Sequence, residues 1–318
     1  MLSVSTNWNS RRHQNGNDLL DEVLSLGVHT VELGYALTHG QLEDLRHRFQ
    51  SGDFRASSVH AFSPFPFPEA EHASPEPYSL CIPPFSFFHP FGARPEAIAE
   101  AENAVLDCAR LAAEFGARRL VLHAGRIPVH SLAIRLYRIV QNGKRGTPLY
   151  ERTLRRLLVK RDRLAAPRID ALRTSLDRIL PRLEPLDVTL CLENLPTADG
   201  CPNEPEMMLL LQAFEGAPLA YWHDIGHAQI RHELGLMHHR GFLRQIGPSI
   251  GGFHVHDVSR ELHDHCMPPG GLVDFRLFSE FVSRPEIPVV LEPRPDLPAA
   301  DIARGLDYLR GLWETLSV

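Results

Sequence analysis

The sequence contains few cysteines, and they form no recognisable pattern. The five cysteines are odd in number, scattered and never spaced as CxxC: Cys81, Cys108, Cys191, Cys201 and Cys266. This distribution argues against a disulfide framework and is typical of reduced thiols. We therefore expect a cytoplasmic protein.

Long hydrophobic runs and an excess of positive charge are also absent. No stretch approaches the roughly 18 apolar residues of a membrane span, and the N-terminal residues contain no apolar run that would act as a signal peptide. The formal net charge is −6, whereas nucleic-acid binding relies on a basic face that neutralises phosphates. We therefore expect neither a membrane nor a nucleic acid as the main partner.

Eight apolar segments with β propensity alternate with helical patterns. They are residues 3–7, 28–34, 54–62, 118–125, 187–194, 219–226, 251–257 and 288–293. Proline or glycine marks most of the helix boundaries. Eight such strands predict one closed parallel (β/α)8 barrel of the TIM type over residues 1–318. An open doubly wound sheet is the alternative, but no GxGxxG-type loop follows a strand.

Two segments depart from this repeat. Residues 63–94, after the third strand, are rich in proline and aromatic residues, and form either a loop packed by its own rings or a lid over the barrel. Residues 126–168, after the fourth strand, are rich in arginine. They predict a helical insertion with a solvated face, or one in which a few arginines bind an anionic substrate group.

Histidine is abundant, with 18 residues, and potential metal ligands end six consecutive strands. These are His60, His123, Glu193, Asp224, His254 with His256, and Glu292. The carboxyl ends of barrel strands meet at one mouth, and carboxylates are almost never buried unless they are paired or metal-bound. The set predicts a divalent-metal site, for which mixed imidazole and carboxylate ligands suit Mn, Zn, Co or Fe.

The motifs around these residues resemble the superfamily of xylose isomerase-like TIM barrels. The matching pieces lie between residues 31 and 293 and read SSVHAF, LVLHAG, CLEN, HDIGHA, FHVHD, HDHCMPPGGLVDF and VVLEP. This superfamily includes sugar and sugar-phosphate isomerases and epimerases, and the endonuclease IV type of AP endonuclease (AP endonuclease family 2). The resemblance implies that Glu193, Asp224, His254 and Glu292 bind the metal, and that His227 contacts substrate or a further metal.

Endonuclease-like members carry additional ligands, which this sequence matches in part. His60 and His123 match their histidines on the third and fourth strands. Their D-x-H pair corresponds to His263 and His265, so a histidine replaces the aspartate. The resemblance therefore implies one to three ions, with His60, His123, His227, His263 and His265 as additional candidate ligands.

Two reactions fit these ligands. A sugar isomerase or epimerase uses the metal to polarise a carbonyl while two glutamates, here Glu193 and Glu292, remove and return a proton. A phosphoester hydrolase uses two or three ions to hold the phosphate and activate water, and a small phosphoester fits better than DNA. We favour the isomerase or epimerase, the commoner activity among small barrels of this type. A barrel that binds sugar without catalysis is the third alternative.

Further residues are expected to contact the small sugar or phosphorylated substrate, and others to be solvated. The expected contacts are His227, His256, Glu32 and Trp8. His238 and His239 lie in a polar stretch and are expected to face solvent. The sequence does not determine whether the chain forms a homo-oligomer.

Overall fold

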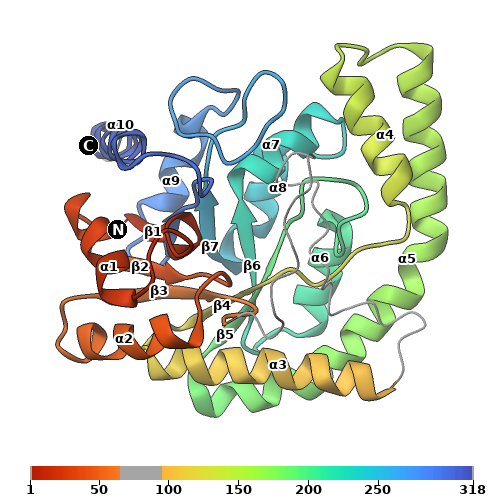
Figure 1. Cartoon of the computed structure of the whole chain (residues 1–318). Helices are drawn as coiled ribbons and strands as arrows, with labels where there is room; N and C mark the ends of the chain where they lie inside the picture. Colours follow the sequence, from red (N-terminus) through yellow and green to blue (C-terminus); the bar gives the residue numbers. More distant parts are fainter. Residues whose placement is uncertain (1, 65–94, 317–318) are drawn as a thin grey trace.

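The strands of the computed structural model, which describes residues 2–64 and 95–316, close into one parallel barrel (Figure 1). Each strand pairs with the next, and the last pairs with the first. The strands are β1 (Leu2–Ser5), β2 (Thr30–Leu33), β3 (Arg55–His60), β4 (Arg119–Leu122), β5 (Thr189–Glu193), β6 (Leu219–Asp224), β7 (Ile250–Val255) and β8 (Val289–Leu291). The predicted (β/α)8 barrel is confirmed.

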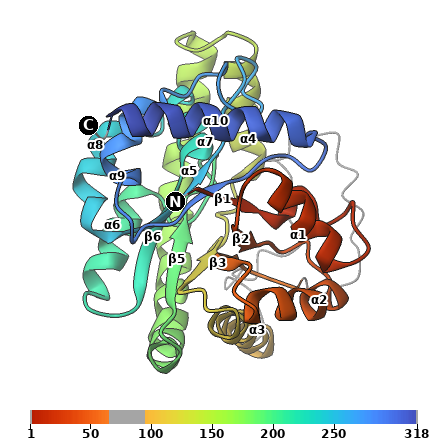
Figure 2. The same cartoon turned by 90° about the vertical axis from the view of Figure 1, so that its left-hand side faces the viewer.

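Helices surround the strands on the outside, as the second view shows (Figure 2). They are α1 (Gly16–Ser25), α2 (His39–Gln50), α3 (Pro95–Glu114), α4 (His130–Gln141), α5 (Pro148–Leu183), α6 (Glu204–Ala213), α7 (Ile225–Glu233), α8 (His239–Ile246), α9 (Ser279–Val282) and α10 (Ala299–Leu316). The largest cluster of buried apolar residues lies between the strands and these helices. It fixes the strand ends, and therefore the side chains that the strands carry into the mouth.

A small separate cluster fills the inside of the barrel. It consists of Val121, Cys191, Ala220, Trp222 and Val290, from four different strands. Successive strand residues face opposite sides, so Trp222 points inward with Asp224, two residues further along β6. The Trp222 ring lies 5.1 Å from the His254 ring, centre to centre, and forms part of the floor below the mouth.

The arginine-rich segment is largely helical, since its first half contains α4. Its second half belongs to α5, which continues without interruption to Leu183 and has Pro167 inside it. Arg161 is buried, and its guanidinium donates to both carboxylate oxygens of Glu206, at 2.6 and 2.8 Å. This arginine stabilises the fold and is not available to an anionic substrate group.

Two further expectations concern the predicted lid and membrane spans. The lid predicted over residues 63–94 lies almost entirely outside them. Among the helices that the structure describes, none is long and apolar enough to cross a membrane.

The close contact between β6 and β7 yields a stability prediction. A β-carbon added at Gly252 would lie 2.0 Å from the Trp222 ring, so we expect Gly252→Ala to destabilise the protein by about 1–3 kcal/mol through overpacking. Gly311 in α10 is exposed, with no atom within 4 Å of an added β-carbon. Gly311→Ala is the control, and should be neutral or stabilising by up to about 1 kcal/mol. Urea unfolding measures both, and equal stabilities would contradict the prediction.

Candidate metal centre

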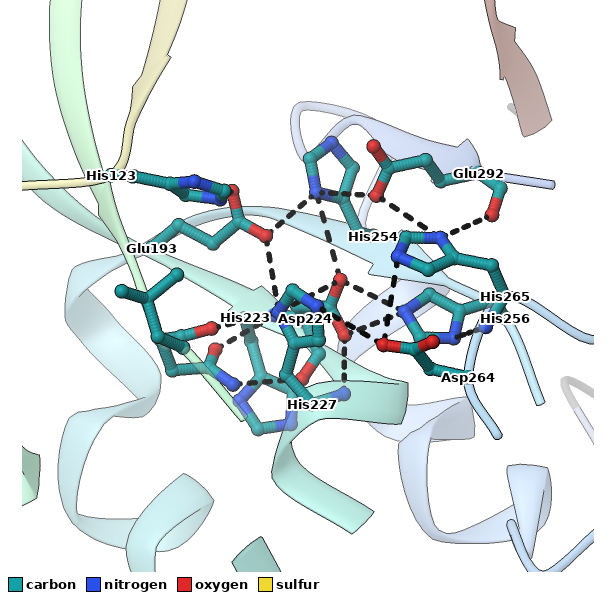
Figure 3. A network of polar contacts seen from close by, with 12 residues as sticks. His123, Glu193, His223, Asp224, His227, His254, His256, Asp264, His265 and Glu292 are labelled. Atoms are coloured by element: carbon teal, nitrogen blue, oxygen red, sulfur yellow. Dashed lines mark hydrogen bonds and ion pairs between the residues drawn. The ribbon is translucent and has the colours of Figure 1, made fainter. Parts of the chain in front are cut away.

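The carboxyl ends of β3 to β8 and the loops after them bring one set of ionisable side chains to the barrel mouth. Within the described residues, three groups place their potential ligand atoms within 4.8 Å of one another. The groups are Glu193, Asp224, His254 and Glu292; then His60, His123 and Glu193; then His227, His256 and His265. Figure 3 shows most of this network, in which Glu193 lies between the first two groups.

The first group contains the four ligands expected from the sequence. Nδ1 of His254 lies 3.1 Å from a Glu193 oxygen, 3.4 Å from a Glu292 oxygen and 3.9 Å from an Asp224 oxygen. All four side chains are buried. Three carboxylates around one imidazole nitrogen form a donor set that suits a divalent cation of borderline softness.

Glu32 lies behind this group and does not line the mouth as a substrate contact. Its carboxylate oxygens lie 3.0 and 3.1 Å from Nε2 of His254, and one of them accepts a hydrogen bond from Ser58 at 2.7 Å. A carboxylate on the remote nitrogen orients a ligating imidazole and raises its basicity. The expectation of a Glu32–substrate contact is therefore corrected: Glu32 positions His254.

The second group uses the other oxygen of Glu193. Oε2 of this carboxylate lies 3.0 Å from Nε2 of His123 and 3.4 Å from Nε2 of His60. On the remote side of His60, Nδ1 lies 2.8 Å from the carbonyl oxygen of Ala61 and donates to it. Nε2 of His60 is thereby left to face Glu193. Oε2 of Glu193 and Nε2 of His123 are both buried, and apart from these contacts neither atom has a polar partner among the described residues.

His227 and His265 of the third group follow the same rule, and Asp264, which the sequence analysis did not single out, lies beside them. Nδ1 of His227 donates to the Asn194 carbonyl, and Nδ1 of His265 donates to the Glu292 carbonyl, each at 3.0 Å. Their Nε2 atoms lie 4.0 and 3.9 Å from Oδ2 of Asp264, which is buried and has no hydrogen bond within the described part of the chain. Two imidazoles and one carboxylate thus converge.

His263 is exposed and does not join the cluster. The expectation that it could bind metal is corrected, because the loop turns the next residue, Asp264, inward instead. An acidic residue between two histidines, HDH, was the available signal, but the spacing expected from the family directed attention to the wrong neighbour.

Two expected substrate contacts are also placed elsewhere. Nδ1 of His256 accepts a hydrogen bond from the backbone N–H of His265 at 2.9 Å, so its Nε2 carries the hydrogen and donates to Asp224. His256 therefore positions Asp224, although the distances alone also admit it to the third group. Trp8 is fully buried and donates from Nε1 to the Leu297 carbonyl at 2.8 Å, so it packs beneath the rim.

The carboxylates determine the protonation of the mouth. Burial opposes a charge on His60, yet the hydrogen bond and charge of Glu193, followed by the charges of Glu32 and Glu292, raise its pKa from 6.5 to about 9. For the same reason the pKa of His254 is raised well above its ordinary value. Without a cation, these histidines carry protons at neutral pH and balance the buried negative charge.

The pKa values of Glu193 and His227 are also shifted by their surroundings. Burial acts to raise the pKa of Glu193, but the charges and hydrogen bonds of His123 and His254 outweigh it, and the pKa is well below its ordinary range. Burial lowers the pKa of His227 to about 3, so this imidazole is neutral and has a lone pair available at Nε2.

Comparisons with known proteins identify the same kind of barrel. The family model described as xylose isomerase-like TIM barrel matches residues 20–312. The chain is similar to D-psicose 3-epimerase from Clostridium cellulolyticum, at 11% identity and a TM-score of 0.65, over 98% of this chain and 99% of that one. It is similar to 3-keto-D-glucoside 4-epimerase from E. coli at 12% identity and a TM-score of 0.64, over 98% of each chain.

A further solved structure is that of a Thermus thermophilus protein, TTHB071, soaked with ZnCl2. It is 20% identical, with a TM-score of 0.55, and the match covers 98% of this chain and 97% of that one. No curated protein matches the sequence. At these identities the structural matches establish the fold alone.

The raised pKa values predict that metal binding releases protons. His60 has a pKa of about 9 in the metal-free mouth, and an imidazole must lose its proton to act as a ligand. At about pH 7.5 we expect adding Zn²⁺ to metal-free protein to release protons, and this release should fade as the pH rises above about 9. Calorimetric titration in two buffers of different ionisation enthalpy measures it. Buffer-independent heats at the lower pH would contradict the prediction.

Proposed function

The chain belongs to the family of xylose isomerase-like TIM barrels, and on this premise we propose that it is a divalent-metal-dependent enzyme acting on a small sugar or sugar phosphate. One observation carries the proposal. The mouth histidines His60, His227, His254 and His265 each donate a remote ring N–H to a carbonyl or carboxylate, and each turns the other nitrogen inward. Metal-ligating histidines are oriented in this way.

The residues present fit such an ion. Oδ2 of Asp264 is buried without a hydrogen bond among the described residues, and Oε2 of Glu193 and Nε2 of His123 have no partner there beyond the contacts between Glu193 and its histidines. Leaving a buried polar atom unsatisfied costs about 1–3 kcal/mol. A cation between Glu193, His60 and His123 would satisfy the Glu193 and His123 atoms, and one beside His227 and His265 would satisfy Oδ2 of Asp264. The donor set of imidazoles and carboxylates suits Mn, Zn, Co or Fe, with Glu193, Asp224, His254 and Glu292 as the best-formed site.

We place sugar isomerisation or epimerisation first. A divalent cation at this site supplies positive charge that stabilises the oxyanion formed when a proton leaves the carbon beside a carbonyl. Glu193 and Glu292 lie on either side of His254 Nδ1, so one carboxylate can remove the proton and the other return it. The names of similar structures, sugar 3- and 4-epimerases, support this choice.

A second candidate, hydrolysis of a small phosphoester, is favoured by a specific observation. Both oxygens of Glu193 face histidines, since Oε1 lies near His254 and Oε2 near His60 and His123. A single-ion isomerase does not need those two histidines, whereas a centre with several ions would use Glu193 as a bridge and hold a phosphate between them. The net charge of −6 argues against DNA as the substrate.

Metal content and two assays test the proposal together. We expect about one to three transition-metal ions per chain after reconstitution with Mn, Zn, Co or Fe, and we expect Glu193→Gln to lower turnover by about 10²–10⁴-fold through loss of the base or bridge. The activity assays are exchange of the substrate C–H hydrogen with D2O, by NMR across ketoses and their phosphates, and release of inorganic phosphate. His47 is exposed, and His47→Ala is the control, which should change neither hydrogen exchange nor phosphate release.

The double variant His60→Ala/His123→Ala separates the two reactions. Retained hydrogen exchange, within about tenfold of the parent, supports the isomerase or epimerase. Complete loss of activity together with loss of an ion supports the hydrolase. Protein that takes up no metal, or that turns over equally well with Glu193→Gln, would refute a metal-dependent enzyme. Substrate and metal binding without any turnover would instead favour a sugar-binding barrel.

A further inference from the structure

The last residue of β6, the candidate ligand Asp224, extends beyond the neighbouring strand β5. The last residue pair that joins these two strands is Glu193 with Trp222, two positions before Asp224. On the β7 side Asp224 still has a strand partner, His254. Asp224 is fully buried, and buried backbone N–H and C=O groups need hydrogen-bond partners. On the β5 side, a side chain provides them.

That side chain belongs to Asn194, the residue directly after β5. Its Oδ1 accepts the backbone N–H of Asp224 at 2.8 Å, and its Nδ2 donates to the Asp224 carbonyl at 3.0 Å. A backbone N–H can only donate and a carbonyl can only accept, so these two contacts fix the orientation of the carboxamide. The buried carboxamide of Asn194 therefore takes the place of a backbone peptide group from the missing strand residue.

Two further side chains of β6 hold the carboxamide in place from outside the barrel. The hydroxyl of Tyr221 donates to the same Oδ1 of Asn194 at 2.8 Å. Since this hydroxyl has only one hydrogen, Nδ1 of His223, 2.8 Å away, donates to its oxygen. The His223 ring in turn lies 5.9 Å from the ring of His239, centre to centre. His239 is only 5% exposed, which corrects the expectation that it faces solvent.

The backbone of Asn194 contacts a second candidate ligand. Its carbonyl accepts the Nδ1–H of His227 at 3.0 Å, which leaves Nε2 of that ring to face the third group. Asn194 is thus joined to three members of the network in Figure 3: to Glu193 by the chain, to Asp224 by its side chain and to His227 by its carbonyl. Because Glu193 faces the mouth, the side chain of the next residue faces away from it.

We propose that Asn194 is a positioning residue of the metal centre, which holds Asp224 and His227 where a divalent cation can bind them. This inference rests on the proposed function, because it requires that the mouth binds a cation. Asn194 itself contacts neither the ion nor the substrate. Contacts of this kind, one step behind the ligands, orient them and commonly change metal affinity by about 10- to 100-fold when they are removed.

A role in packing alone would have different consequences from a positioning role. Removal of the carboxamide leaves the N–H and C=O of Asp224 without their partner, in a region where both are buried. If Asn194 only supported the fold, this loss would lower the stability of the protein and leave the bound ion unchanged. If Asn194 positions Asp224, the ion should be bound more weakly and its coordination should change.

Titration of the metal-free protein with Co²⁺ alone, followed by visible absorption, tests this role. We expect Asn194→Ala to lower the Co²⁺ affinity by about 10- to 100-fold and to shift the absorption bands of the bound ion. Asn9→Ala is the matched control, since Asn9 is also fully buried but donates to the Leu19 carbonyl and to Glu22 of α1, each at 3.0 Å. It should lower the stability measured in urea and leave the affinity and the spectrum of Co²⁺ unchanged.

Wild-type affinity and spectrum in Asn194→Ala would overturn the proposal. An equal loss of affinity in Asn9→Ala would also overturn it, because general destabilisation would then explain both. If Asn194→Ala does not fold, as judged by far-ultraviolet circular dichroism, Tyr221→Phe removes only one bond to Oδ1 and should weaken Co²⁺ binding by about two- to tenfold; unchanged binding would overturn the proposal. Wild-type protein that binds no Co²⁺ would instead count against the proposed function, so the two failures are distinguishable.

Discussion

Burial of the Glu193 carboxylate is the interaction on which the mouth depends. The end of an apolar strand carries this group into the protein interior, where a charge without compensation would be very costly. The neighbouring histidines compensate this charge: one oxygen of Glu193 faces His254, and the other faces His60 and His123. Removing this carboxylate would leave the surrounding histidines without their common partner. The contacts that orient these histidines, such as that of Glu32 with His254, therefore help to stabilise one central negative charge.

The meeting of the strand-end side chains at one mouth could be predicted from the sequence because the geometry of parallel barrels is general, whereas their role as ligands is implied only by the family resemblance. Every strand delivers its last residues to the same mouth, so Glu193, Asp224, His254 and Glu292 needed only correct strand boundaries. Side chains that depend on irregular pairing were harder to predict. The register between β2 and β3 shifts at Glu32, which pairs with Ser58 while the preceding Val31 pairs with Ala56. No alternation pattern in the sequence indicates this shift.

Loops and long-range contacts account for the remaining differences. The path of the loop after β7 decides whether His263 or Asp264 turns inward, and the sequence contains no signal for that choice. Arg161 in α5 looked solvated because its partner, Glu206, lies 45 positions along the chain. His239 likewise lies in a polar stretch, and its burial depends on packing against β6. In each case the local sequence was compatible with two environments, and tertiary contacts selected one.

The choice between the two proposed reactions depends on whether Glu193 acts as a base or as a bridge. A good general base has a pKa near the working pH, but the neighbouring imidazoles hold the pKa of Glu193 well below its ordinary range, which weakens it as a proton acceptor. Burial acts to raise the pKa of Glu292 and the charges of His254 and His265 lower it as well, but its side chain remains 8% exposed, so it is the better placed base. Proton transfer by the two glutamates therefore requires that His60 and His123 do not bind a cation together with Oε2 of Glu193. If they do, both oxygens of Glu193 are ligands, and its remaining role is to hold two ions together.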